Sequence, residues 1–101
     1  MARFWVLRDK QTVRVASLEE WAREFELHDR HVAITEIGAC RVSTVFLGVD
    51  HSFHDEGPPL LFESMVFGGP LDQEQRRYST WDEAEAGHAE LVEQVQRAVL
   101  Q

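Results

Sequence analysis

The stretch from Val32 to Leu47 reads VAITEIGACRVSTVFL, and it decides the fold. Val32 to Ile37 and Arg41 to Leu47 are the clearest strands of the chain, and Gly38-Ala39 lies between them. Glycine can take the positive φ that a tight hairpin requires. The stretch therefore predicts a β-hairpin in the middle of the chain.

On the C-terminal side of this hairpin, the polar segment from Val49 to Pro59, VDHSFHDEGPP, is expected to be a loop. Proline fixes φ and withholds a hydrogen-bond donor, so the next strand is expected to begin only at Leu60 and to run to Phe67. Gly68-Gly69-Pro70 ends that strand as a turn, and a polar stretch continues to Arg77.

On the N-terminal side, Arg3 to Leu7 is rich in residues that suit a strand, and Thr12 to Val15 can pair back across a polar turn at Asp9-Lys10. Ser17 opens a helix, because Glu20 three residues later completes a capping box. Apolar residues then recur at helical spacing, namely Leu18, Trp21, Ala22 and Phe25. The polar run from His28 to Arg30 ends this helix.

The strongest helical pattern lies at the C-terminal end. Thr80 can cap a helix, with Glu83 three residues on. A continuous apolar stripe follows at helical spacing: Trp81, Ala84, His88, Leu91, Val92, Val95 and Val99. The expected order is ββ-α-βββ-α, which predicts a single compact domain over residues 1–101 of the α+β class, with two layers: a mainly antiparallel sheet and two helices on one face.

Composition narrows the possible partners. The chain has 101 residues, a formal net charge of −8 and a pI near 5.0. Nucleic-acid binders need a basic surface, so direct binding of DNA or RNA is not expected. No apolar run is long enough to cross a membrane and no signal peptide is recognisable, so we expect a cytoplasmic protein with no membrane partner. The single cysteine, Cys40, excludes an intrachain disulfide and a cysteine-based zinc site.

Three phrases carry a resemblance to known proteins. They run VSTVFLGVDH from Val42, PPLLFESMVFGG from Pro58 and RYSTWDEAEAGH from Arg77. Together they resemble a family of small uncharacterised proteins of bacteria, phages and prophages. The resemblance brings no catalytic residues, and it implies a phage or prophage setting in which a small acidic protein acts by binding a host protein, for example to block a defence complex.

The first functional hypothesis follows from this setting. No recognisable catalytic set is present, so a binding protein is favoured over an enzyme, and no cofactor is expected. The acidic helix beginning at Asp82 has two interpretations: a solvated face over a core stripe, or a surface that docks on a basic groove of a host protein. In the second interpretation Asp82, Glu83 and Glu85 are the partner-binding residues.

The alternative hypothesis is a metal-binding module or a small metal-dependent enzyme. Asp50, His51 and His54 lie in one loop, and His88 on the last helix could complete a site for a divalent metal, since imidazole and carboxylate are common metal ligands. The spacing matches no standard metal motif. The structural interpretation is that Asp50 and His51 fix the turn by local hydrogen bonds and that His54 lies on a solvated loop tip. In this interpretation His88 is a core residue whose ring nitrogens find partners.

Three further residues have expected structural roles. Glu63 lies in an apolar strand and needs Arg41 or Arg77 as an ion-pair partner, unless it faces water or has a raised pKa as a candidate acid or base. Cys40 is expected to fill space, and Gly87 to permit close packing of the last helix against the sheet. A third possibility for the whole chain is a homo-oligomeric subunit, such as a homodimer in which a second copy covers an exposed sheet edge or face.

Overall fold

The structure, a computed structural model, describes residues 4–27, 29–50 and 57–100. Its elements are β1 (Phe4–Arg8), β2 (Gln11–Val15), α1 (Leu18–Leu27), β3 (His31–Ile37), β4 (Cys40–Phe46), β5 (Phe62–Phe67), β6 (Gln75–Tyr78) and α2 (Trp81–Val99). The α+β class and the order of the elements are confirmed. The structure adds one short strand, β6, where the sequence suggested only a polar stretch.

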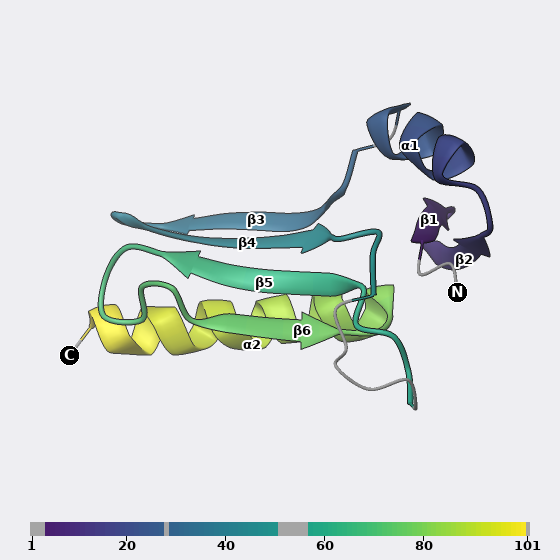
Figure 1. Cartoon of the computed structure of the whole chain (residues 1–101). Helices are drawn as coiled ribbons and strands as arrows, with labels where there is room; N and C mark the ends of the chain where they lie inside the picture. Colours follow the sequence, from purple (N-terminus) through teal and green to yellow (C-terminus); the bar gives the residue numbers. More distant parts are fainter. Residues whose placement is uncertain (1–3, 28, 51–56, 101) are drawn as a thin grey trace.

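Four strands form the main sheet in the order β3-β4-β5-β6, and every neighbouring pair is antiparallel (Figure 1). The predicted central hairpin is β3–β4, in which Ile37 pairs with Cys40 across the two-residue turn. Gly38 has a φ of +58°, as this turn requires. The strands follow one another in sequence, but only β3 and β4 are joined by a tight turn; residues 47–61 connect β4 to β5 and residues 68–74 connect β5 to β6.

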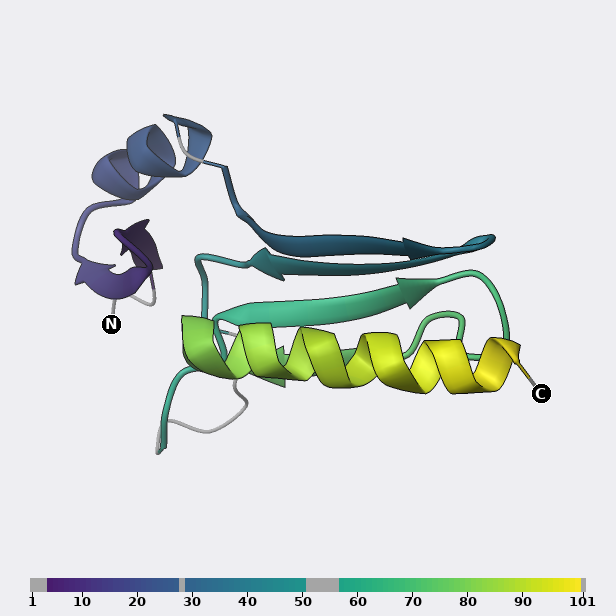
Figure 2. The ribbon, with the colours of Figure 1, turned by 180° about the vertical axis from the view of Figure 1, so that it is seen from behind.

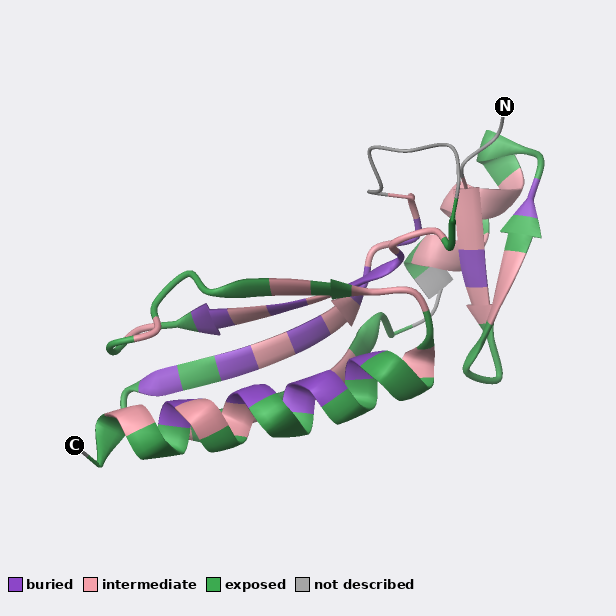
Figure 3. Ribbon diagram, turned by 90° about the horizontal axis from the view of Figure 1, so that it is seen from below, coloured by how far each residue is buried: buried purple, intermediate pink, exposed green. Residues whose placement is uncertain are grey.

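Helix α2 covers one face of the main sheet, as the view from behind shows (Figure 2). The predicted capping box is present: the Thr80 hydroxyl accepts from the Glu83 amide at 3.1 Å, and the Glu83 carboxylate accepts from the Thr80 amide at 3.1 Å. The side of α2 that faces the sheet is buried and the other side is exposed (Figure 3). At the C-terminal end of the stripe, Val99 is 44% exposed.

The core between α2 and the sheet has two apolar clusters. One contains Cys40, Val42, Val66, Leu91 and Val95. The other contains Phe46, Leu61, Phe62 and Ala84, with aromatic residues of the N-terminal elements packed against it. Between the two clusters, β4, β5 and α2 each contribute a buried polar residue, namely Thr44, Ser64 and His88.

The first three elements form a unit of their own at one end of the main sheet (Figure 1). Strands β1 and β2 pair as a separate two-stranded hairpin, and α1 packs mainly on that hairpin, so the expectation of one sheet with both helices on one face is wrong. Arg8 at the end of β1 donates to Glu24 of α1 from Nε at 3.0 Å and from Nη2 at 2.7 Å. We call β1, β2 and α1 the N-terminal unit.

The N-terminal unit joins the main sheet at Gly48, just after β4. The Gly48 carbonyl accepts from the Trp5 amide at 2.8 Å and from the Trp21 indole Nε1 at 3.0 Å. Around this point the Trp21 ring stacks on Phe25, and Phe25 contacts Phe46 of the main core. The Gly48 carbonyl, an isolated β-bridge between Phe4 and Val49 and a row of aromatic rings therefore hold the two parts together.

Candidate functional site

Helix α2 carries more carboxylates than any other element among the described residues. Its exposed positions hold five carboxylates: Asp82, Glu83, Glu85, Glu90 and Glu93. A single arginine, Arg97, leaves the helix with a formal charge of −4, half of the −8 of the whole chain. With a rise of about 1.5 Å per residue, the carboxylates extend over about 17 Å. We call these five residues the acidic ridge.

The three residues that the sequence suggested for partner binding form the N-terminal part of this ridge. All three are exposed, but two of them also stabilise the helix. Glu83 closes the capping box, and Glu85 accepts from the Trp81 indole at 3.2 Å. Glu90 and Glu93 lie further along the ridge, and their side chains are 65% and 59% exposed. Glu93 pairs with the exposed Arg97, whereas Glu90 lies 3.7 Å from the partly buried Arg76 and accepts from Gln94 at 3.5 Å. Ion pairs this exposed or this long contribute little to stability.

The buried polar residues between the two core clusters form one hydrogen-bonded layer. The His88 imidazole binds the Thr44 hydroxyl through Nδ1 at 2.7 Å and the Thr35 hydroxyl through Nε2 at 2.8 Å. The Thr44 hydroxyl also lies 2.5 Å from the Ser64 hydroxyl. Burial lowers the pKa of His88 below its usual value, because the charged imidazolium is poorly solvated there. The imidazole is therefore neutral at pH 7, with one ring nitrogen donating and the other accepting.

A histidine beside two hydroxyl groups has the residue types of a nucleophile and its base. Thr44 and Ser64 are both 0% exposed, however, so a substrate cannot reach either oxygen. This polar layer is part of the core, as the structural interpretation of His88 expected. Sequence reasoning missed Thr35, Thr44 and Ser64. Their inward positions could have been found from the alternation of β3, β4 and β5 once the helix-facing side of the sheet was known.

The candidate metal ligands fall in different environments. His51 and His54 lie outside the described residues. Asp50 accepts from the Leu60 amide at 3.0 Å and so ties the two ends of its loop together, which is the structural role proposed for it. Both ring nitrogens of His88 are engaged by hydroxyl groups and are not free to bind a metal. Among residues 4–27, 29–50 and 57–100, no three metal-binding side chains gather at one point.

The other single-residue expectations are met. Glu63 accepts from Arg77 Nε at 3.1 Å, so the expected ion pair forms with the second of the two candidate arginines. Cys40 is a buried member of the core. A Cβ at Gly87 would lie 2.3 Å from a ring carbon of Tyr78, so glycine is what lets α2 approach this ring.

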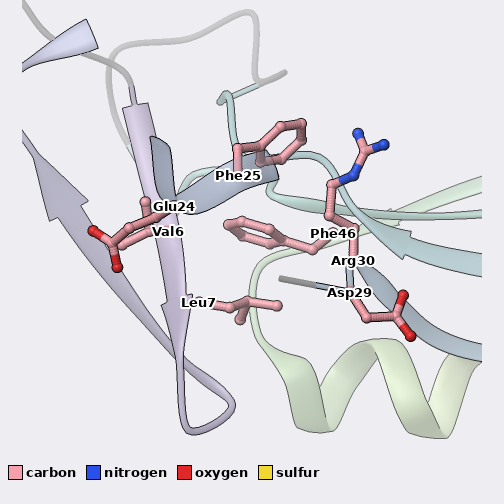
Figure 4. A pocket seen from close by; sticks show the side chains of 7 residues that line it. All are labelled: Val6, Leu7, Glu24, Phe25, Asp29, Arg30 and Phe46. Carbon is pink, nitrogen blue, oxygen red and sulfur yellow. The ribbon is translucent and has the colours of Figure 1, made fainter. Parts of the chain in front are cut away.

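A small hollow lies where the N-terminal unit meets the main sheet (Figure 4). Its walls include Leu7, Phe25 and Phe46, so it is mainly apolar. The charged groups at its edge are already engaged: Asp29 accepts from the His31 amide at 3.0 Å, and the Arg30 guanidinium lies 4.3 Å from the centre of the Phe25 ring. This hollow is a packing seam and offers no group for catalysis.

Comparison with known proteins found no matching family model, no matching curated protein and no matching solved structure. The resemblance drawn from the three sequence phrases therefore stays a prediction. No helix among the described residues is long and apolar enough to cross a membrane.

Proposed function

We propose that this protein acts by binding another protein, and that the acidic ridge of α2 docks on a basic surface of that partner. In the phage or prophage setting that the sequence phrases imply, the partner is a host protein. The observation that supports this proposal is the segregation of charge: the ridge holds five carboxylates on the exposed side of one rigid helix.

The ridge suits a binding role for physical reasons. Capping at Thr80 and packing of the buried side of α2 against the sheet fix the helix, so its carboxylates are held in a defined array before binding. Complementary charge steers association and selects partners. The ion pairs of Glu90 and Glu93 are weak, because the first is long at 3.7 Å and the second is exposed, so basic side chains of a partner can replace them at little cost.

The test is an affinity pull-down of tagged protein from a lysate of its host, read by mass spectrometry and repeated with purified partner. The informative variant is E90K/E93K, because neither residue caps the helix. Its matched control is E19K/E26K, which makes the same change of charge at exposed positions of α1.

We expect wild type and the α1 variant to retain one stoichiometric partner, and the α2 variant to lose it. Binding should also weaken as salt rises, because exposed charges are screened. Equal loss in both variants would show non-specific attraction to an acidic protein. No retained partner at all would count against a binding role.

A further inference from the structure

We propose that the face of the main sheet opposite α2 binds a second copy of this chain, so that the protein forms a dimer by packing sheet on sheet. We call this side the open face. The proposal concerns a different surface from the acidic ridge and does not depend on what the ridge binds.

The open face follows from the alternation of side chains along each strand. Val42, Thr44 and Phe46 of β4 are buried toward α2, so Arg41, Ser43 and Val45 point the other way. Figure 1 looks onto this side of the sheet, and Figure 2, seen from behind, shows α2 in front of the opposite side. No helix or strand within the described ranges covers the open face.

Four apolar side chains lie around Ser43 on the open face, namely Ile34, Val45, Met65 and Phe67. The strand pairing places Ile34 of β3, Ser43 of β4 and Met65 of β5 in one row across the sheet. Val45 and Phe67 lie in the rows on either side of it. Ile34 is 50% exposed and Phe67 is 47% exposed, and both are among the largest apolar side chains that reach solvent. Covering them removes apolar surface from water, which favours association.

The charge of the open face points to a second copy as the occupant. Its charged side chains form two internal pairs, Glu36 with Arg41 at 2.8 Å and Glu63 with Arg77 at 3.1 Å. The face is therefore neutral within a chain of net charge −8. A strongly basic partner gains nothing there, whereas a second open face is equally neutral and apolar. In a two-fold dimer the same patch meets itself, so this match is automatic.

The position of the acidic ridge favours the same arrangement. Each α2 lies on the far side of its own sheet, so face-to-face packing leaves the two ridges outermost. With layers about 10 Å apart, the ridges are roughly 30 Å from each other, well beyond the Debye length of about 8 Å at physiological salt. Contact through α2 would instead bring two helices of charge −4 together.

The size of the open face sets the strength of the dimer. Strands of 4 to 7 residues at about 3.3 Å per residue, spaced about 4.8 Å apart, give a footprint of about 400 Å². Stable interfaces bury about 800 Å² per partner. We therefore expect a weak, reversible dimer with a dissociation constant of about 10–100 µM.

The experiment is sedimentation velocity of the full chain from about 1 µM to about 500 µM, a range that brackets such a constant. Wild type should shift from monomer to dimer over this range. The variant I34K/F67K should stay monomeric, since both positions are exposed and each lysine would be desolvated in the dimer. The matched control is L18K/V99K, which alters residues that are 57% and 44% exposed on other surfaces; it should dimerise like wild type.

Circular dichroism confirms that each variant is folded. Raising the salt concentration should tighten the dimer, because it screens the repulsion of two chains of charge −8. A wild-type chain that stays monomeric over the whole range overturns the proposal. So does an I34K/F67K variant that dimerises as well as wild type. The charge-reversal variant E90K/E93K should not weaken dimerisation, so this result and the pull-down can fail separately.

Discussion

Replacing Gly48 by alanine tests how the N-terminal unit is attached to the sheet. Gly48 is buried, and its φ is +77°, in the left-handed region that side chains disfavour. A Cβ at this position would lie 2.6 Å from Phe25 Cε2 and 2.9 Å from Trp21 Nε1. An alanine at position 48 therefore requires the backbone and the two rings to shift, or the N-terminal unit to move away from the sheet.

Two terms set the size of the effect. Placing alanine in a left-handed conformation costs about 1–2 kcal/mol. Forcing an extra carbon into a packed site costs about 1–3 kcal/mol more. We therefore expect Gly48→Ala to lower the free energy of unfolding by about 2–5 kcal/mol. The control is Gly38→Ala, because Gly38 has a φ of +58° but a Cβ there meets nothing within 4 Å. The free energy of unfolding of that variant should fall only by the cost of the left-handed conformation, about 1–2 kcal/mol.

The assay is urea unfolding followed by tryptophan fluorescence and far-UV circular dichroism. Hydrogen exchange adds the location of the change: in Gly48→Ala, amides of β1 and α1 should exchange faster relative to those of β4 and β5. The reasoning would be refuted if Gly48→Ala lost no more stability than Gly38→Ala and left exchange in β1 and α1 unchanged. That result would mean that the aromatic rings move aside at no cost.

Three further predictions concern α2. Burial lowers the pKa of His88 in the folded chain below its unfolded value near 6.5. Between these two pKa values the unfolded chain binds more protons than the folded chain, so the free energy of unfolding falls as the pH drops below about 6.5 and is unaffected by His88 above it. Urea unfolding at several pH values should show this slope, and His88→Gln should lack that part of it. Thr80→Ala removes the cap and should cost about 1 kcal/mol, seen as a lower Tm. Gly87→Ala gains about 1 kcal/mol of helix propensity but must displace the Tyr78 ring, at about 1–3 kcal/mol, so we expect a net loss; an unchanged or raised Tm would show that the ring is free to move.

Much of the fold could be predicted because its elements depend on local patterns. The hairpin at Gly38 and the cap at Thr80 need only residues within a few positions of each other. The same holds for the buried stripe of α2, which repeats every three to four residues. Strand β6 was missed because Gln75 to Tyr78 is polar and short. It is a strand only because β5 offers an edge with which it can pair.

The candidate surfaces were only partly accessible from the sequence. The sequence shows that α2 contains five carboxylates. That all five are exposed on one side of the helix follows from which side packs against the sheet. The role of His88 as a core residue was expected, whereas its partners Thr35 and Thr44 were not. Those partners lie 53 and 44 residues away along the chain.

The sequence by itself determined the class of the fold, the ends of its helices, its main hairpin and its net charge, because these depend on residue type and short-range spacing. Only the tertiary structure decided that α1 packs on β1 and β2, that Gly48 joins this unit to the sheet, and that one face of the sheet stays open. These features depend on contacts between residues distant in sequence. Such contacts form when the apolar side of one element is buried against a second element. Local sequence patterns show which side is apolar but do not show which element will cover it.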